Sequence, residues 1–252
     1  MNLPETYASH TETFKVRTYE AGRNDRLTIQ TLCDYLQEAA GIHAENLGAA
    51  FSYLQSLGIT WVLCKMVMEV NEYPRTGSRV SVQTWPSSTE RIQCRRDFFW
   101  RGEDGRLLGR AATYWVIANM ATRRLERLPD FVRAFFPETP FYALEDPKEK
   151  LPTLKPEPGD TQGLSFVTRL ADIDRNDHVN NVRYIDWAIE SVPAEIRNSR
   201  ELYGLTVDFR AEAVLGDSIE VRVAPCGDGS YCHGVFRKED MRELARARTL
   251  WR

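Results

Sequence analysis

Two stretches of the chain, Arg101–Trp115 and Arg237–Trp251, are copies of one another. The first reads RGEDGRLLGRAATYW and the second reads RKEDMRELARARTLW, with nine of the fifteen positions identical at a constant offset of 136. In the first copy, a Glu-Asp-Gly turn joins two strand-like runs, which is the pattern of a β-hairpin. The sequence therefore predicts related hairpins in the two halves of the chain.

Two further matches extend this repeat toward the start of each half. Gly77–Val82 resembles Gly216–Val221 at an offset of 139, and a third match has an offset of 152. That third match pairs Phe14, Arg17 and Arg23-Asn24-Asp25 with Phe166, Arg169 and Arg175-Asn176-Asp177. An ordered series of three matches indicates a duplicated unit, with small deletions in the second copy.

Each half is predicted to contain one main helix and several strands. Apolar residues at helical spacing predict helices over 27–47 and 181–191. Alternating or continuous apolar runs predict strands at 61–70, 79–85, 92–100 and 111–118, and again at 164–170, 205–210, 218–224, 231–237 and 244–251. One helix followed by an antiparallel meander favours a sheet wrapped around that helix. Two such units give an α+β architecture.

Proline density suggests where the two units divide. Seven of the 12 prolines lie between positions 129 and 158, and such density excludes long helices and central strands. We therefore predict an N-terminal domain at 1–128, a proline-rich linker at 129–158 and a C-terminal domain at 159–252.

The bulk composition narrows the class of protein. A formal net charge of −3 and a pI near 5.9 give no general attraction for nucleic acid or for a membrane surface. There is no apolar run of 18 residues, and residues 1–13 lack the basic cluster and apolar core of a targeting peptide. Five cysteines without a CxxC pair favour a reducing compartment. We expect a cytoplasmic protein.

The polar run at 172–184 holds the candidate chemistry. Asp174, Asn176 and His178 alternate, so in an extended chain their side chains would point the same way. The helix expected directly afterwards would bring free N–H groups to the same point, and those near Val179 and Asn180 are candidate oxyanion donors. Together these groups are suited to activating water against a polarised carbonyl.

This run, followed by Asn181 and by a Tyr-Ile-x-Trp helix, resembles the acyl-acyl carrier protein thioesterases. The resemblance covers essentially the whole chain and implies a tandem double hot-dog fold. It also implies hydrolysis of fatty acyl thioesters with acyl carrier protein as the partner, without a metal or cofactor. The N-terminal hot dog would shape the acyl-chain pocket, and the C-terminal one would be catalytic.

The resemblance assigns catalytic positions residue by residue. Asp174, Asn176 and His178 match the catalytic motif, and Glu212 matches the family's glutamate on the following strand. The plant members have cysteine directly after that glutamate, whereas this chain has Ala213. A cysteine nucleophile is impossible at that position, so we expect water activated through Glu212 and His178. One of the two asparagines at 180 and 181 is expected to cap the helix instead.

The repeat supplies an internal comparison. Gly22, Asn24 and Arg26 stand at the places of Asp174, Asn176 and His178, and Tyr73 stands at the place of Glu212. The first half therefore keeps only the asparagine, which predicts one active site per chain.

Several alternatives remain open from the sequence. Arg95 and Arg96 belong to a locally basic stretch that could dock the acidic carrier protein, although a solvated surface is the default interpretation. A hot-dog enoyl-thioester hydratase or dehydratase is the nearest rival enzyme. A non-catalytic acyl-thioester-binding protein is the other class, and a homodimer is left open.

Overall fold

The computed structural model describes residues 3–4, 7–145, 150–154, 163–227 and 229–252. The chain divides into two compact units, unit 1 (Met1–Asp146) and unit 2 (Pro147–Arg252). The division falls inside the predicted linker, of which Pro147, Pro156 and Pro158 lie outside the described residues. Within the described part of the chain, no helix has the length and apolar character needed to cross a membrane.

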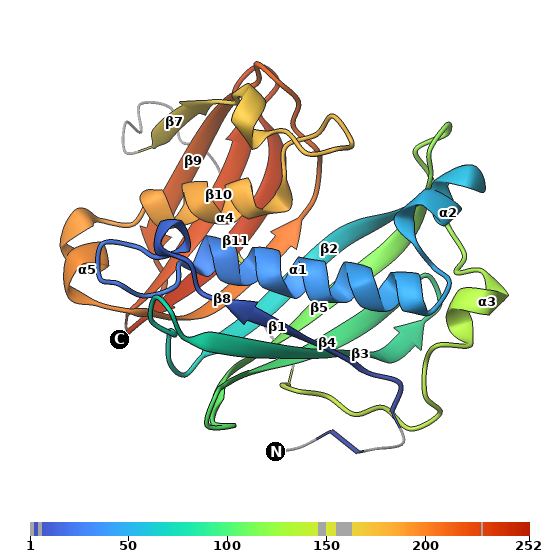
Figure 1. Cartoon of the computed structure of the whole chain (residues 1–252). Helices are drawn as coiled ribbons and strands as arrows, with labels where there is room; N and C mark the ends of the chain where they lie inside the picture. The colour runs from blue at the N-terminus through green and yellow to red at the C-terminus, as the bar shows by residue number, and fades with distance from the viewer. Residues whose placement is uncertain (1–2, 5–6, 146–149, 155–162, 228) are drawn as a thin grey trace. The chain divides into compact units, whose positions relative to one another are not determined.

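Unit 1 is an antiparallel sheet with one long helix, α1, lying across a face (Figure 1). The strand order is β1-β3-β4-β5-β2, and the short β6 (Leu125–Glu126) pairs with β5. The strands are β1 (His10–Lys15), β2 (Ile59–Val70), β3 (Arg79–Glu90), β4 (Gln93–Gly102) and β5 (Leu107–Asn119). The helices are α1 (Ile29–Asn46), α2 (Phe51–Ser56) and α3 (Asp130–Arg133).

Helix α1 is the predicted helix of the first half, and its sequence explains both its start and its buried face. Thr28 has extended backbone and its side chain accepts the N–H of Thr31, which caps the helix. The fully buried Leu32, Leu36 and Ala39 recur at helical spacing and place one face against the sheet.

The first part of the predicted linker is packed into unit 1. Trp85 Nε1 donates to the carbonyl of Phe141 at 2.9 Å, and the Phe141 ring contacts Trp85 and Phe99. Ala143 and Leu144 are buried beside these residues and β4. Residues 141–144 therefore belong structurally to unit 1, because burial of this aromatic segment outweighs the looseness that its prolines suggest.

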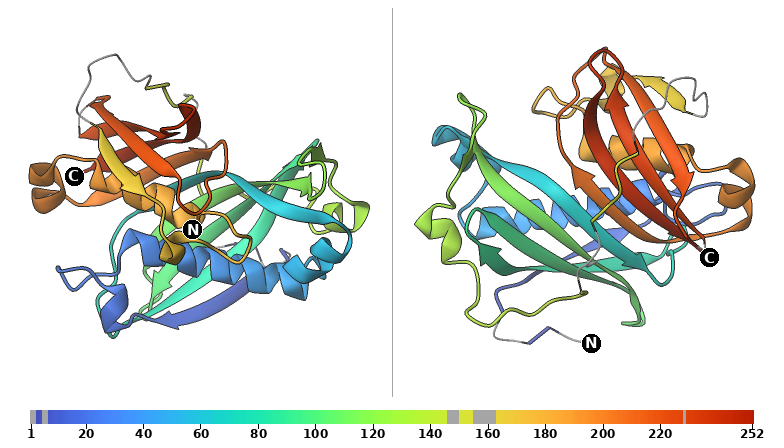
Figure 2. Two further views of the ribbon diagram at one scale, coloured as in Figure 1. Left: turned by 90° about the horizontal axis from the view of Figure 1, so that it is seen from above. Right: turned by 180° about the vertical axis from the view of Figure 1, so that it is seen from behind.

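Unit 2 repeats the arrangement of unit 1. Its antiparallel strand order is β8-β11-β10-β9-β7, and α4 packs against β9, β10 and β11 (Figure 2). The strands are β7 (Leu164–Val167), β8 (Leu202–Phe209), β9 (Ser218–Pro225), β10 (Ser230–Arg237) and β11 (Arg242–Trp251). The helices are α4 (Asn181–Glu190) and α5 (Ala194–Ser199). Two units, each a set of antiparallel strands packed on a central helix, confirm the predicted α+β double hot-dog fold.

The repeat extends to individual backbone angles. Gly77 and Gly216 have φ of 85° and 87°, and Asp25 and Asp177 have φ of 59° and 60°. All four residues adopt the left-handed conformation, and each glycine does so without steric cost. The sequence matches at offsets 139 and 152 therefore mark structurally equivalent turns.

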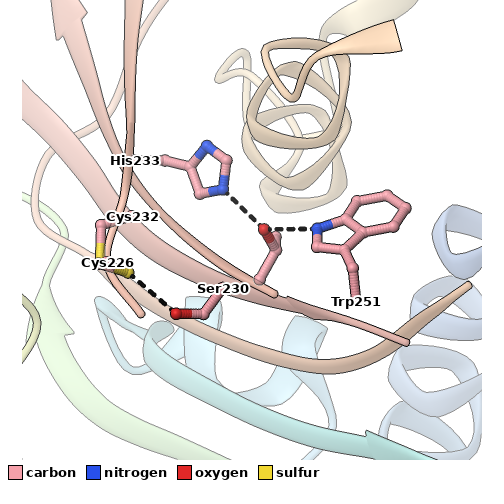
Figure 3. The surroundings of a disulfide bond; sticks show 6 residues. Cys226, Ser230, Cys232, His233 and Trp251 are labelled. Atoms are coloured by element: carbon pink, nitrogen blue, oxygen red, sulfur yellow. Dashed lines mark hydrogen bonds between the residues drawn. A yellow bond between two sulfur atoms is a disulfide. The ribbon is translucent and has the colours of Figure 1, made fainter. Parts of the chain in front are cut away.

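A disulfide joins Cys226 to Cys232 across the turn between β9 and β10 (Figure 3). Cys33, Cys64 and Cys94 carry free thiols. Cysteine count and spacing did not predict this pair, because the two residues become neighbours only when the hairpin closes.

Candidate active site

The residues Asp174 to His178 form a tight turn between η2 (Leu170–Asp172) and α4. The N–H of Asp174 donates to the carbonyl of His178 at 2.8 Å, and Asp177 takes the left-handed conformation. The extended conformation that was expected here is therefore wrong. The local hydrogen bonds of a short polar turn determine the backbone here, and the alternation of polar residues does not produce a strand.

The carboxylate of Asp174 organises this turn. Its Oδ1 accepts the backbone N–H of Asn176 at 2.7 Å and that of His178 at 3.4 Å. Its Oδ2 accepts Nδ2 of Asn176 at 3.3 Å, so one amide hydrogen of Asn176 is held by the carboxylate. The amide has a second hydrogen, which leaves a donor for a substrate or a water.

Glu212 meets His178 although 34 residues separate them in the sequence. His178 Nε2 lies 3.3 Å from Glu212 Oε2. The side chain of His178 is 20% exposed and that of Glu212 is 49% exposed, so both groups are open to solvent on one side. A carboxylate on an imidazole nitrogen is an arrangement that accepts a proton from water.

The backbone N–H groups at the start of α4 are hydrogen-bonded within unit 2. Asn180 is the N-cap, and its Oδ1 accepts the N–H of Val182 at 2.9 Å. The N–H of Val179 donates to the carbonyl of Ala213, and the N–H of Asn180 donates to that of Asp172, both at 2.9 Å. The predicted oxyanion role of the Val179 and Asn180 N–H groups is therefore wrong, because both donors are already used. The predicted cap is confirmed.

Asp172, the last residue of η2, stabilises the turn and was not identified from the sequence. It is almost fully buried, accepts the N–H of Arg169 at 2.8 Å and lies 3.5 Å from Nε of Arg183. Burial alone would raise the pKa of the Asp172 carboxyl, but hydrogen bonds from Arg169 and the charge of Arg183 lower the pKa below its usual value. Glu20 likewise accepts the N–H of Arg17 in unit 1. An arginine followed three residues later by a carboxylate occurs in both halves, and this repeated spacing could have identified Asp172 from the sequence.

Arg95, a predicted docking residue, is buried. Its Nε and Nη2 donate to the two carboxylate oxygens of Asp97 at 2.7 and 2.8 Å, and Nη2 also donates to the carbonyl of Leu144. The Arg95 side chain is 8% exposed and that of Asp97 is fully buried. This bidentate pair fastens the 141–144 segment to β4.

Arg96 points to the opposite face of the sheet and is also engaged. Its Nη1 lies 2.9 Å from Nδ1 of His43 and 3.2 Å from Oγ1 of Thr84. Carrier-protein docking through Arg95 and Arg96 is therefore wrong, because their guanidinium groups serve the interior of unit 1. A buried β-strand can carry arginines when each has internal partners.

Unit 1 confirms the equivalence used in the internal comparison. The N–H of Leu27 donates to the carbonyl of Pro74 at 2.8 Å, as Val179 does to Ala213. This alignment places the buried Tyr73 where Glu212 stands in unit 2. Arg26 likewise stands where His178 does, so unit 1 has neither the histidine nor the glutamate of this contact at the equivalent positions.

Comparison with known proteins identifies the family. Residues 7–136 match the Acyl-ACP thioesterase N-terminal domain, and residues 157–252 match the Acyl-ACP thioesterase C-terminal domain. Among solved structures, the 12:0-ACP thioesterase from Umbellularia californica has a TM-score of 0.86 at 27% identity, covering 99% of both chains. An acyl-ACP thioesterase from Bacteroides thetaiotaomicron has a TM-score of 0.85 at 25% identity, covering 97% of this chain and 98% of the other.

Curated relatives that are similar in sequence are also acyl carrier protein thioesterases. Oleoyl-acyl carrier protein thioesterase 1, chloroplastic, of Arabidopsis thaliana is 34% identical over all of this chain and 78% of its own length. Palmitoyl-acyl carrier protein thioesterase, chloroplastic, of Cuphea hookeriana is 35% identical over 96% of this chain, which spans 61% of that relative. The chain therefore belongs to the acyl-acyl carrier protein thioesterase family, as its sequence predicted.

Proposed function

We propose that this chain hydrolyses fatty acyl thioesters of acyl carrier protein and releases free fatty acid and carrier protein. The observation that carries the proposal is the 3.3 Å approach of His178 Nε2 to Glu212 Oε2. This pair is partly exposed, so water and a substrate can reach it. The names of the relatives support the thioester of acyl carrier protein as the substrate.

In the proposed mechanism, the His178–Glu212 pair takes a proton from a bound water. The water oxygen then forms a bond to the thioester carbon, and negative charge develops on the carbonyl oxygen. The free amide hydrogen of Asn176, whose other hydrogen is held by Asp174, donates to that oxygen or orients the water. When the C–S bond breaks, the proton passes to the carrier's sulfur.

Site variants test the proposal directly. His178→Ala and Glu212→Gln are expected to lower kcat for acyl-carrier-protein hydrolysis by about 10²–10⁴-fold, since each removes part of the proton acceptor. The measurement is the amount of free fatty acid released from acyl-carrier-protein thioesters that differ in acyl chain length. If both variants keep near-wild-type rates, the assignment of this site is wrong.

The repeat provides a matched control for Asn176. Asn24 stands at the equivalent turn of unit 1, where its Oδ1 accepts the N–H of Arg26 at 3.2 Å. We expect Asn176→Ala to lower kcat and Asn24→Ala to leave it unchanged. Equal loss in both variants would show that the effect comes from turn stability, and it would contradict a catalytic role.

Ala213 favours attack by water over a cysteine nucleophile, and the family relationship favours hydrolysis over the rival activities. The residue after Glu212 has no thiol, so an acyl-cysteine intermediate cannot form there. A hydratase or a non-catalytic binding protein is not favoured, because the matching family models and the curated relatives are acyl-ACP thioesterases. Hydration of an enoyl thioester without hydrolysis would reverse this preference.

We also propose that the enzyme acts in the cytoplasm. Three free cysteines and the unremarkable composition support this location, whereas the Cys226–Cys232 bond is typical of an oxidising compartment. Cell fractionation provides the check, and we expect the protein in the cytoplasmic fraction. Recovery of the protein from an oxidising compartment would contradict the location. The homodimer stays a prediction.

A further inference from the structure

Glu212 lies outside the strand ladders, in the segment between β8 and β9. Its neighbour Ala213 is fully buried and is held through both backbone groups. The carbonyl of Ala213 accepts the N–H of Val179 at 2.9 Å, and its N–H donates to the phenol oxygen of Tyr184, also at 2.9 Å. Val179 directly follows His178. The two hydrogen bonds therefore tie the residue beside Glu212 to the residue beside His178 and to α4.

The side chain of Tyr184 is itself fixed. Tyr184 is 3% exposed, and its ring packs edge-on against Phe209 at a centroid distance of 6.0 Å and lies 5.4 Å from Trp187. Phe166 stacks on Trp187 and closes the cluster. A phenol oxygen held this firmly is a rigid acceptor, because rotation about its χ angles would disrupt the ring packing.

Unit 1 shows how the same fold is built without this tie. Leu32 stands at the place of Tyr184, and Pro74 stands at the place of Ala213. Proline has no N–H to satisfy, so leucine without a hydroxyl is sufficient there. The bond between Leu27 N–H and the Pro74 carbonyl is nevertheless kept. The fold therefore forms with leucine and proline at the positions of Tyr184 and Ala213. The Tyr184–Ala213 hydrogen bond occurs in unit 2, which also has the His178–Glu212 contact.

We infer that Tyr184 is a positioning residue, whose phenol oxygen holds the Ala213 backbone so that Glu212 stays against His178. The inference rests on the proposed function. Glu212 is bonded directly to Ala213, so the position of the Ala213 backbone sets where the Glu212 side chain begins and how its carboxylate reaches His178. Small displacements of a reacting group lower rates steeply.

Two variants separate positioning from plain stability. Tyr184→Phe keeps the ring but leaves the buried N–H of Ala213 without an acceptor, so both Tm and kcat should fall, the latter roughly tenfold. The double variant Tyr184→Phe/Ala213→Pro removes that N–H as unit 1 does. We expect it to regain Tm while kcat stays roughly tenfold low and KM stays within about twofold of wild type.

The result that would overturn the inference is equally defined. If kcat returns together with Tm in the double variant, the hydroxyl serves stability alone. If Tyr184→Phe keeps wild-type kcat at a temperature where it is folded, the inference also fails. Should the double variant not fold, the kcat–pH profile of Tyr184→Phe decides. A shift of the profile supports positioning, and an unchanged profile contradicts it.

Tyr35 supplies the matched control in unit 1. It is a buried tyrosine on α1 whose hydroxyl donates to Glu20 Oε2 at 2.7 Å. Tyr35→Phe should lower Tm and leave kcat unchanged. Failure of the proposed function is distinguishable, because then the wild type would not hydrolyse the thioester at all. An active wild type, an inactive His178→Ala variant and an unaffected Tyr184→Phe variant would remove only this inference.

Discussion

His233 on β10 is a completely buried histidine whose tautomer follows from its neighbours (Figure 3). Ser191 Oγ donates to the carbonyl of Ala188 at 2.7 Å, so its single hydrogen is used and it must accept from His233 Nδ1 at 3.0 Å. His233 Nε2 then accepts from Thr249 Oγ1 at 2.9 Å, while Trp251 Nε1 donates to Thr249. A neutral imidazole makes both of these hydrogen bonds, whereas a protonated imidazole could no longer accept the hydrogen bond from Thr249.

This geometry predicts a dependence of stability on pH. Burial lowers the pKa of His233 from about 6.5 to about 3. Below pH 6.5 the unfolded chain binds a proton that the folded chain does not, so the free energy of unfolding falls as pH drops from about 6.5 toward about 3. The slope is at most about 1.4 kcal/mol per pH unit for this residue. His233→Gln should therefore flatten the fall measured by urea unfolding at pH 7 and pH 5. Equal slopes in both proteins would contradict this account.

At the scale of elements, periodicity located the long segments and missed most of the short ones. The helix predicted at 181–191 is Asn181–Glu190, and the strand predicted at 231–237 is Ser230–Arg237. Both carry an apolar face long enough to set a period. Strand β1 and the short helices α2, α3 and α5 were not predicted, because six or fewer residues hold few repeats of any period. Their positions depend on packing against the rest of their unit. The four-residue β7 was located within the strand predicted at 164–170.

The candidate site shows the same division between local and tertiary information. Asp174, Asn176 and His178 lie on one turn, so their sequence spacing was enough to group them. Glu212 came from the resemblance alone, since nothing in its local sequence points to His178. Tyr184 was seen only as part of a helical motif. Its bond to Ala213 depends on where the segment after β8 crosses α4, and spacing along the chain does not encode that crossing.

At the scale of the whole molecule, duplication separates the requirements of the fold from those of the chemistry. Features shared by both units, such as the left-handed Gly77 and Gly216, serve the fold. Features confined to unit 2, such as the contact between His178 and Glu212, are candidates for function. The predicted docking arginines were misplaced for a separate reason. Arg95 contributes to the interior of unit 1 through Asp97, and charge density in a sequence does not reveal burial.

The comparison of units also predicts the number of sites. Tyr73 is 7% exposed and carries no charge where Glu212 offers a half-exposed carboxylate, so unit 1 has no proton acceptor at that point. A non-hydrolysable thioether analogue of acyl-acyl carrier protein should therefore bind with a stoichiometry of one per chain in calorimetric titration. Asn24→Ala should change neither that stoichiometry nor the Kd. Two equivalents bound per chain would mean that unit 1 holds a second acyl-carrier site, and the equivalence of the units would then extend from fold to function.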